Sequence, residues 1–249
     1  CNRVDCRTLL KIKFHIKIKL IKVGMIFLLK HGISENHWSH EKTEDTKNKC
    51  VVTEDISNKV NVVPNIVHYI LYRRNYITFI HFVSIRSVQR NQKPEKIYIH
   101  CDCDELTGEY WNRLNKSQIV VIRTKEPKVI FGNVLFSVFH SSDIGRMNIL
   151  MKYGGIYLDT DVFLVNKLNI FFKYEMTLGW PEGDNLGTQV LIATKNARFL
   201  KLWLQSYKTY NGSLWYYNAG EYPTKFILEP HPDLVHRIKE ELGVKCCDM

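Results

Sequence analysis

The sequence predicts an α/β fold in which a mostly parallel central sheet is flanked by helices. Short apolar runs alternate with segments whose apolar residues recur at helical spacing. The alternation continues through residues 60–210 without an internal repeat, and a chain of 249 residues that is 45% hydrophobic can bury one sizeable core. Strands separated by helices are typical of βαβ units, whose parallel sheets bind ligands at the carboxyl ends of the strands.

The first half of the predicted domain holds three strands and two helices. Pro64 leads into the apolar run of 60–72, which predicts a buried strand. Residues 77–91 have apolar side chains at helical spacing and precede Lys93-Pro94, which predicts a helix. The other expected elements of this half are strands at 96–102 and 118–124 and a short helix at 105–116.

The second half begins with a helix. Ser141 or Ser142 is expected to cap its start, and Gly154-Gly155 to stop it. The run IYLDTDVFLV at 156–165 is expected to be the next strand. The remaining expected elements are short strands at 177–180 and 188–194, a helix at 197–210 and a single C-terminal helix at 231–249.

The composition divides the chain into three segments. Residues 1–33 are basic and apolar, 34–60 are polar and without periodicity, and 61–249 hold the predicted domain. The first segment falls short of the about 20 apolar residues of a membrane helix. We expect it to be a degenerate anchor or a disordered segment through which the chain could reach a membrane, followed by a linker or stem. The first methionine is Met25, so we expect an incomplete N-terminus, and the early end suggests a domain truncated at its C-terminus.

The net charge of +10 does not predict a nucleic-acid partner, because it is unevenly distributed. Residues 1–30 hold eight Lys/Arg against one acid, which is +7 and leaves +3 for the rest of the chain. A nearly balanced domain lacks the basic surface of a nucleic-acid-binding protein. The seven cysteines form no CxxC pair, and Cys101 and Cys103 in a CxC are only a weak indication of a metal.

Asp159 and Asp161 follow the buried run of the fourth strand. Side chains two residues apart on a strand point to one face, so both carboxylates would face the same crevice. Two neighbouring carboxylates away from water require a positive partner, and their hard oxygens suit Mg²⁺ or Mn²⁺. The alternative is that both are solvated at the end of the strand.

Asp143 and Arg146 lie three residues apart on the preceding helix and therefore share a face. Taken alone, they are as well explained by an exposed ion pair as by a binding site. Together with the two glycines and the D-x-D, they form a much more specific pattern within 19 residues.

The stretch SSDIGRMNILMKYGGIYLDTDV, residues 141–162, resembles the central signature of the DXD-containing glycosyltransferases of the family 32 type. This family groups α-1,4-galactosyl- and α-1,4-N-acetylglucosaminyltransferases, yeast mannosyltransferases and related large clostridial toxins. PNIVHYILY at 64–72 is similar to its first strand, and weaker similarity runs from about Val60 to Ile238. The resemblance implies a GT-A (Rossmann-like) fold, a UDP-sugar donor and a divalent cation, usually Mn²⁺ and otherwise Mg²⁺.

The resemblance also assigns roles to four residues. Asp161 would bind the metal directly, while Asp159 would hold the ribose or donor sugar and reach the metal through water. Both are therefore the expected catalytic residues. Asp143 and Arg146 would bind hydroxyls of the donor sugar.

The nucleotide and acceptor sides are less well defined. His68, Tyr69 and Tyr72 are the candidates for nucleotide binding, and the family's usual aromatic residue, which stacks on uracil, is replaced here by Leu71. For His68 itself, a packed structural histidine is favoured over a catalyst. The candidates for the acceptor side and reaction centre are Asp184, Asn185 and Gln189, and Glu182 is a further candidate nucleophile.

The resemblance therefore predicts a metal-dependent retaining glycosyltransferase that moves a hexose or N-acetylhexosamine to a glycan, glycolipid or glycoprotein acceptor. A front-face route, in which the leaving phosphate assists the acceptor, is preferred over double displacement. By the same resemblance the protein would lie in the Golgi lumen as a type II membrane protein. The alternatives are a catalytically impaired nucleotide-sugar-binding protein and, less favoured, a HAD-type phosphohydrolase, which needs an acidic pair that the later sequence lacks.

Overall fold

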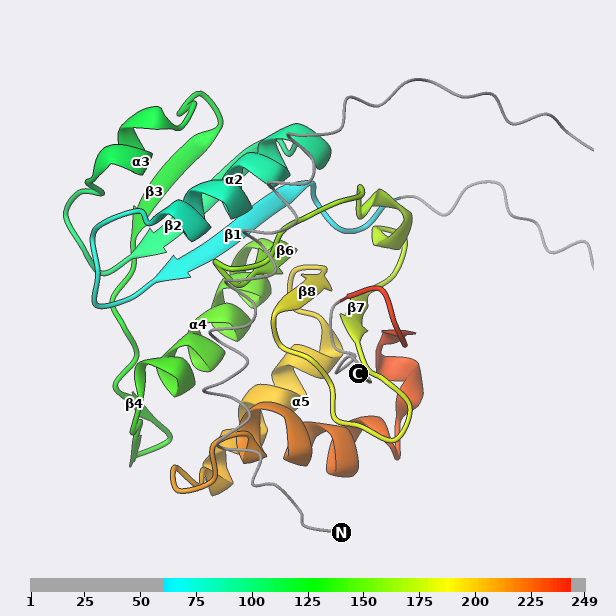
Figure 1. The fold of residues 1–249 in the computed structure, drawn as a ribbon. Helices are drawn as coiled ribbons and strands as arrows, with labels where there is room; N and C mark the ends of the chain where they lie inside the picture. The colour runs from blue at the N-terminus through cyan, green and yellow to red at the C-terminus, as the bar shows by residue number, and fades with distance from the viewer. Residues whose placement is uncertain (1–60, 243–249) are drawn as a thin grey trace, which may run out of the picture. The chain divides into compact units, whose positions relative to one another are not determined.

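The computed structural model of the chain describes residues 61–242, in which seven strands form one central sheet (Figure 1). Their order across the sheet is β3-β2-β1-β6-β8-β7-β9. The strands are β1 (Ile66–Leu71), β2 (Lys96–Cys101), β3 (Ile119–Arg123), β6 (Gly155–Leu158), β7 (Met176–Gly179), β8 (Val190–Ala193) and β9 (His236–Ile238). A separate antiparallel hairpin joins β4 (Val129–Ile130) to β5 (Asn133–Val134).

Most neighbouring strands run parallel. The pairs β3-β2, β2-β1, β1-β6 and β7-β9 are parallel, and only the two pairs that involve β8 are antiparallel. All strands of the sheet except β8 therefore end at the same edge, which we call the carboxyl edge, and β8 begins there. The predicted α/β fold with a mostly parallel sheet is confirmed, and it is the arrangement that the resemblance to a GT-A fold implied.

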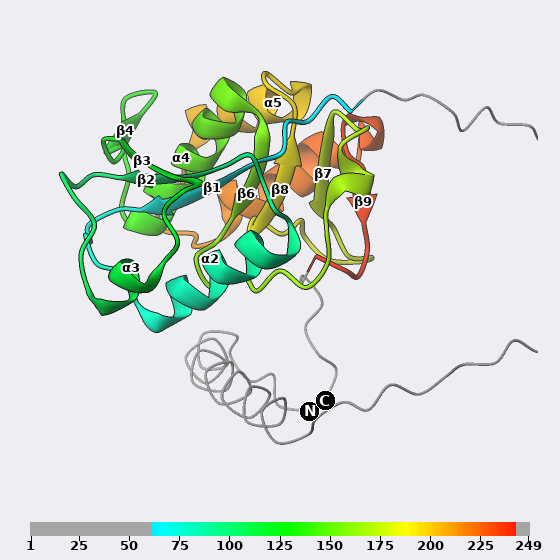
Figure 2. The same cartoon turned by 90° about the horizontal axis from the view of Figure 1, so that it is seen from above.

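Helices cover both faces of this sheet. Figure 2 shows α2 (Phe79–Asn91) and α3 (Glu109–Arg113) on one side, with α4 (Val138–Tyr153) and α5 (Arg198–Ser206) on the other. The strands supply alternate side chains to the two cores. In β1, Tyr69 and Leu71 pack in the core beneath α2, whereas Ile70 packs in the core beneath α4 and α5.

The predicted stop of α4 is confirmed, and its predicted cap is wrong. The cap is Ser137, four residues before Ser141, and its hydroxyl accepts the His140 backbone N–H. At the other end the backbone of Gly154 has φ 66° and that of Gly155 has φ 105°. A β-carbon on Gly155 would lie 2.6 Å from the carbonyl oxygen of Ile66, so only glycine allows β6 to approach β1 here.

The expected strand at 156–165 is too long. β6 ends at Leu158, and the chain then turns, with the Val162 N–H donating to the Asp159 carbonyl oxygen at 3.0 Å. Asp159 and Asp161 therefore do not share one face of a strand, and the argument from strand alternation is corrected: the two carboxylates lie on a turn at the carboxyl edge.

The expected C-terminal helix is also wrong within the described residues. Pro232–Leu234 forms a short 3₁₀ turn, and the chain continues as β9 beside β7. In this strand His236 pairs with Thr177, about 60 positions away in the sequence. Because β9 forms through this distant pairing, the local sequence carries no signal for it. The predicted segments 1–33 and 34–60 lie outside the described residues, and no helix in the part described is long and apolar enough to cross a membrane.

Candidate active site

Three charged side chains meet at the carboxyl edge, two from α4 and one from the turn after β6. Nη2 of Arg146 lies 3.2 Å from Oδ1 of Asp143, and its Nη1 lies 3.5 Å from Oδ1 of Asp159. Asp143 and Arg146 are buried, while the Asp159 side chain is 33% exposed. The three side chains form what we call the acidic cluster, which opens to solvent through Asp159.

The guanidinium of Arg146 is held from several directions. Its Nη1 donates to the carbonyl oxygen of Thr188 at 2.6 Å, and its Nε donates to that of Ser142 at 3.3 Å. The guanidinium carbon lies 4.8 Å from the ring centroid of Tyr157, a distance typical of cation–π contacts. A buried guanidinium with this many partners is fixed in place and orients both carboxylates.

The environment shifts the ionisation of the cluster. Burial raises the pKa of Asp143 to about 6, against the opposing effect of Arg146 and with a smaller contribution from Asp159. Burial alone would lower the pKa of Arg146, but Tyr157, Asp159 and Asp143 together raise it, so Arg146 stays charged. The Tyr157 hydroxyl donates to Oδ1 of Asp159 at 2.8 Å, and burial raises the pKa of this tyrosine well above its usual value.

Tyr157 and the Thr188 carbonyl belong to the site but were not among the predicted residues. A signal for Tyr157 was available, since it lies two residues before Asp159 and side chains at that spacing point the same way on a strand. The backbone carbonyl of Thr188 has no sequence signal, because its position depends on the pairing of β8 with β6.

Asp161 is exposed on the turn after β6, next to the acidic cluster in the sequence. Tyr157 and Arg146 both contact Oδ1 of Asp159. The described residues contain no group of three or more His, Cys, Asp or Glu side chains arranged to hold a metal. Two carboxylates on one turn fit a Mg²⁺- or Mn²⁺-type ion that keeps waters and takes further oxygens from phosphate. They do not fit a cation held by protein ligands alone.

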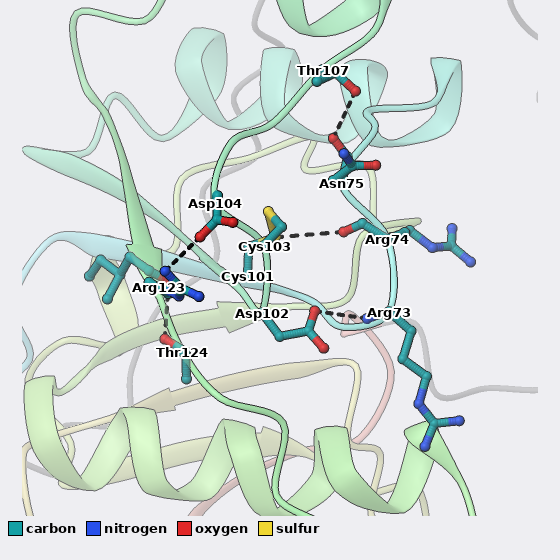
Figure 3. The surroundings of a disulfide bond; sticks show 11 residues. Arg73, Arg74, Asn75, Cys101, Asp102, Cys103, Asp104, Thr107, Arg123 and Thr124 are labelled. Atoms are coloured by element: carbon teal, nitrogen blue, oxygen red, sulfur yellow. Dashed lines mark hydrogen bonds and ion pairs between the residues drawn. A yellow bond between two sulfur atoms is a disulfide. The ribbon is translucent and has the colours of Figure 1, made fainter.

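A second feature of the carboxyl edge is a cavity of about 530 Å³ at the ends of β1 and β2. It is lined by Arg73, Arg74, Asn75, Asp102, Cys103, Asp104 and Glu105. Figure 3 shows this region around the disulfide between Cys101 and Cys103, a bond that was not predicted from the sequence.

The two loops at this cavity are tied together. The Arg73 backbone N–H donates to Oδ1 of Asp102 at 2.9 Å, and Arg123 pairs with Asp104 at 2.6 Å (Figure 3). The Arg73 side chain reaches the other way, to the buried carboxylate of Glu126 at 2.8 Å. The ends of β1, β2 and β3 are therefore joined by ion pairs beside a cavity with both signs of charge.

The contacts of His68 and Tyr69 do not fit the predicted role in nucleotide binding. Both side chains are fully buried. His68 uses one ring nitrogen with His100 at 3.1 Å and the other with the Gly154 carbonyl at 2.9 Å. The Tyr69 hydroxyl is hydrogen-bonded to Ser84 at 3.0 Å in the core beneath α2. His68 is thus the packed histidine of the alternative interpretation.

Tyr72 is different, because its buried hydroxyl has no hydrogen-bond partner within the described residues. It lies over α4, where a β-carbon on Gly145 would come within 2.7 Å of the hydroxyl oxygen. Burial, Asp102 and Glu126 all raise its pKa, so it remains a neutral donor. Of the three nucleotide-binding candidates, only Tyr72 keeps an unused polar group.

The acceptor candidates lie in the loop between β7 and β8, at the same edge. Asp184 and Asn185 line a cavity of about 580 Å³ together with Trp180, Glu182, Gly183, Lys225, Glu229, Pro232 and Arg237. Gln189 does not line this cavity. Its side-chain amide donates to the Leu242 carbonyl at 3.2 Å, and its backbone carbonyl accepts the Asp159 backbone N–H at 2.9 Å. Gln189 therefore contributes to the position of Asp159.

Comparison with known proteins bears directly on this region. Residues 82–179 match the family model described as a glycosyltransferase sugar-binding region containing a DXD motif. The chain is also 30% identical over 200 residues to glucan organizing enzyme 1 of Cryptococcus neoformans var. grubii serotype A, which covers 72% of this chain and 53% of that protein. The chain therefore spans about half the length of this curated relative.

Two solved structures are similar in fold to parts of the chain. One is the PaToxG glycosyltransferase, with 17% identity over 68% of this chain and 70% of that chain, and a TM-score of 0.47. The other is the galactosyltransferase LgtC in complex with donor and acceptor sugar analogs, with 12% identity over 59% of this chain and 61% of that chain, and a TM-score of 0.34.

The acidic cluster and the D-T-D turn both fall inside the matched segment. Asp143, Arg146, Asp159 and Asp161 are all between residues 82 and 179, and Asp159-Thr160-Asp161 has the form of a DXD motif. Residues 82–179 of this chain are therefore similar to glycosyltransferase sugar-binding regions that contain a DXD motif.

Proposed function

We propose that this protein is a metal-dependent retaining glycosyltransferase that transfers a hexose or N-acetylhexosamine from a UDP-sugar to a glycan, glycolipid or glycoprotein. The observation that carries the proposal is the acidic cluster, built into a DXD-containing sugar-binding region and open to solvent at the carboxyl edge of the sheet. This edge is where open α/β sheets bind their ligands.

The charge of the cluster supports a cationic ligand. Within the cluster two carboxylates, those of Asp143 and Asp159, share the single guanidinium of Arg146, and Asp161 adds a carboxylate on the adjoining turn. Partly buried carboxylates with excess negative charge are stabilised by a divalent ion. Asp161 and Asp159 would hold Mn²⁺ or Mg²⁺. The bound ion would supply Lewis-acid stabilisation of the charge that develops on the departing diphosphate.

The chain's own residues would bind and orient the donor. The Asp143 carboxylate would accept hydrogen bonds from hydroxyls of the sugar, and Arg146 would donate to them. Because Arg146 is also held by the Thr188 carbonyl and the Tyr157 ring, the orientation of the sugar would follow from the packing of α4 against β6. Fixing the anomeric carbon in this way reduces the entropy cost of reaching the transition state.

The contacts of the candidate nucleophiles favour the front-face route for retention. Glu182 is exposed and pairs with Lys239 at 3.3 Å, and the Gln189 amide is bonded to the Leu242 carbonyl. Asp184 is exposed and accepts the Asn185 N–H at 2.7 Å. The exposed Glu182 and Asp184 side chains lack the buried support that a nucleophile held for double displacement should have, and the Gln189 side chain is a neutral amide.

A catalytically impaired nucleotide-sugar-binding protein is the second candidate. Leu71, which takes the place of the family's stacking aromatic residue, is buried in the core beneath α2 and offers no ring to a base. Such a protein would bind UDP or a UDP-sugar with metal but would not turn it over. A Golgi location as a type II membrane protein stays a prediction from the resemblance.

The first experiment is calorimetric titration of UDP into the full chain, with Mn²⁺ and with EDTA. We expect binding with Mn²⁺ that is lost in EDTA and lost in the variant Asp161→Asn. Asp233→Asn is the matched control, because Asp233 is an exposed carboxylate that precedes β9 and so lies at the opposite edge of the sheet. Equal UDP binding with Mn²⁺ and with EDTA would contradict the metal-dependent site.

Turnover separates the two candidates. The same samples are incubated with a panel of UDP-sugars, and released UDP is measured with and without acceptor glycans. Metal-dependent release that Asp161→Asn abolishes supports the transferase. Metal-dependent binding without release from any UDP-sugar would instead support the impaired binding protein.

A further inference from the structure

Seven apolar side chains are exposed together at the N-terminal end of α4. Their exposed fractions range from 44% for Phe131 to 78% for Phe136. They come from the β4–β5 hairpin, the start of α4 and the loop after α5, and we call them the apolar platform: Val129, Phe131, Val134, Phe136, Phe139, Leu214 and Trp215. Exposed apolar groups that are contiguous, unlike scattered ones, mark interaction sites.

The members of the platform are adjacent in space. Val129 and Val134 are directly paired across the hairpin, so their side chains lie on the same face. The Phe139 and Trp215 rings meet edge to face at 5.0 Å, and the Phe136 ring lies so close to Gly212 that a β-carbon there would clash with it. Figure 1 shows the hairpin and the amber segment after α5 at the same end of α4.

The backbone beneath the platform is held in place. The Phe136 N–H donates to the Tyr210 hydroxyl at 3.2 Å, and Ser137 caps α4 directly after it. The ring of His140 contacts the Tyr210 hydroxyl at 2.5 Å and the Trp215 carbonyl at 3.3 Å. The rings are therefore exposed on an ordered support, and fraying of a loop does not account for their exposure.

The charge around the platform is predominantly positive. Segments 125–142 and 206–217, which contain the platform residues, hold three lysines and one acid. That acid is Glu126, which is buried and pairs with Lys128 and Arg73. The ammonium group of Lys208 lies 5.7 Å from the centroid of the Phe131 ring. Aromatic and aliphatic side chains with a lysine beside them, in segments that expose no acid, complement the interface of a bilayer that contains anionic lipids.

We propose that the apolar platform is a peripheral docking surface for a bilayer that contains anionic lipids. Phenylalanine and tryptophan rings would enter the interfacial region, and Lys208 would face the lipid phosphates. Phe139 lies one helical turn before Asp143, so a docked molecule would hold the acidic cluster close to the membrane surface. The docking itself does not depend on the proposed function.

The test measures the environment of Trp215 in the full chain, because the basic residues 1–30 could bind vesicles by themselves. The emission of Trp215 is isolated as the difference between the parent and Trp215→Phe. With vesicles of phosphatidylcholine and phosphatidylglycerol, we expect this emission to shift to the blue, to be shielded from acrylamide and to be quenched by lipids brominated on their acyl chains. Pure phosphatidylcholine vesicles should give a smaller effect.

Variants locate the binding surface. Phe136→Ser with Lys208→Glu should remove the shielding of Trp215, whereas Phe163→Ser with Ile170→Ser should leave it unchanged. Phe163 and Ile170 are comparably exposed, at 57% and 69%, but lie after β6 and outside the platform. Val134→Ser replaces Phe136→Ser if circular dichroism shows that the first variant is unfolded.

Two results would overturn the proposal. In the first, the chain binds vesicles, or fails to bind them, while acrylamide reaches Trp215 equally with and without lipid. In the second, sedimentation velocity shows a concentration-dependent dimer that the Phe136 variant abolishes, and the dimer persists with vesicles. The platform would then be an interface between two copies of the chain.

Discussion

Two buried polar clusters lie at opposite ends of α4 and β6, and they differ in charge. His68 and His100 contact each other at 3.1 Å, and their outer nitrogens reach the Gly154 carbonyl and the Thr124 hydroxyl. Burial lowers the pKa of His68 to about 4 and that of His100 to about 3, so both are neutral at pH 7. The acidic cluster is charged and carries more negative than positive groups.

The difference separates a structural cluster from a binding site. In the histidine cluster every ring nitrogen has a partner within the chain, so a ligand could add nothing without breaking a hydrogen bond. In the acidic cluster one guanidinium is shared by two carboxylates, and a third carboxylate follows on an exposed turn. Only the second arrangement is left to be completed by an ion or substrate.

The largest expected loss of unfolding free energy comes from removing the guanidinium that Asp143 and Asp159 share in the acidic cluster. Arg146→Met would leave Asp143 buried without its cation, which costs about 3–5 kcal/mol of unfolding free energy. Urea denaturation at pH 7.5 measures the loss. Arg113→Met is the control, because Arg113 is exposed and makes surface contacts with Glu109 and with the rings of Phe82 and Tyr110. A loss below about 1 kcal/mol for Arg146→Met would mean that the cluster is not buried in solution.

The next effect concerns the histidine cluster and depends on pH. The folded pKa of His68 lies below its ordinary 6.5, so its contribution to stability is present above pH 6.5 and is lost as pH falls through 4. The shift corresponds to about 3 kcal/mol. His68→Gln should remove this acid loss, as followed by urea denaturation between pH 7 and 4, whereas exposed His231→Gln should keep it.

The contribution of Asp143 to the unfolding free energy should change with pH in the opposite direction within the same pH range. Its folded pKa of about 6 lies above the ordinary 3.8, so its contribution is present below pH 3.8 and is lost as pH rises through 6. Asp143→Asn should therefore make stability rise more steeply with pH between 4 and 6, by slightly less than the His68 effect. An unchanged pH slope would show that Asp143 is solvated and titrates normally.

The smallest effect on stability is expected at the exposed turn. Asp161→Asn should change the unfolding free energy by less than about 0.5 kcal/mol, since surface substitutions rarely do more. The same variant should lose Mn²⁺-dependent UDP binding, as measured by calorimetry. A large loss of stability would indicate that Asp161 has a structural role and would remove the contrast with Arg146.

The sequence could predict the alternation of elements but not where the sheet stops. Apolar residues continue from Val162 to Val165, so the run reads as one strand, yet Phe163 and Val165 are exposed. Their positions depend on which strands are available as neighbours: β6 pairs with β1 as far as Tyr157 and with β8 as far as Leu158. Similarly, β9 forms a strand because it pairs with β7, which is far away in the sequence.

The candidate site was predictable where residues lie close together in the sequence. Asp143, Arg146, Asp159 and the DXD turn occur within 19 positions, and the structure brings the first three together. The nucleotide-binding residues could not be predicted in this way. Because β1 is buried on both faces, its periodicity does not show which side chains reach the carboxyl edge. The roles of all these residues in catalysis stay predictions.

The close approach of Gly155 to Ile66 fixes where the Asp159 carboxylate lies along the sheet. The contact with Ile66 sets where β6 begins along β1, and Asp159 follows four residues later, about 13 Å along an extended chain. One inserted residue in this interval would turn every later side chain to the opposite face of the sheet. Changes in chain length are therefore compatible with the site only outside 155–159. The position of the D-T-D turn along the sheet is thus counted from a glycine, and the contacts of Asp159 orient its carboxylate there.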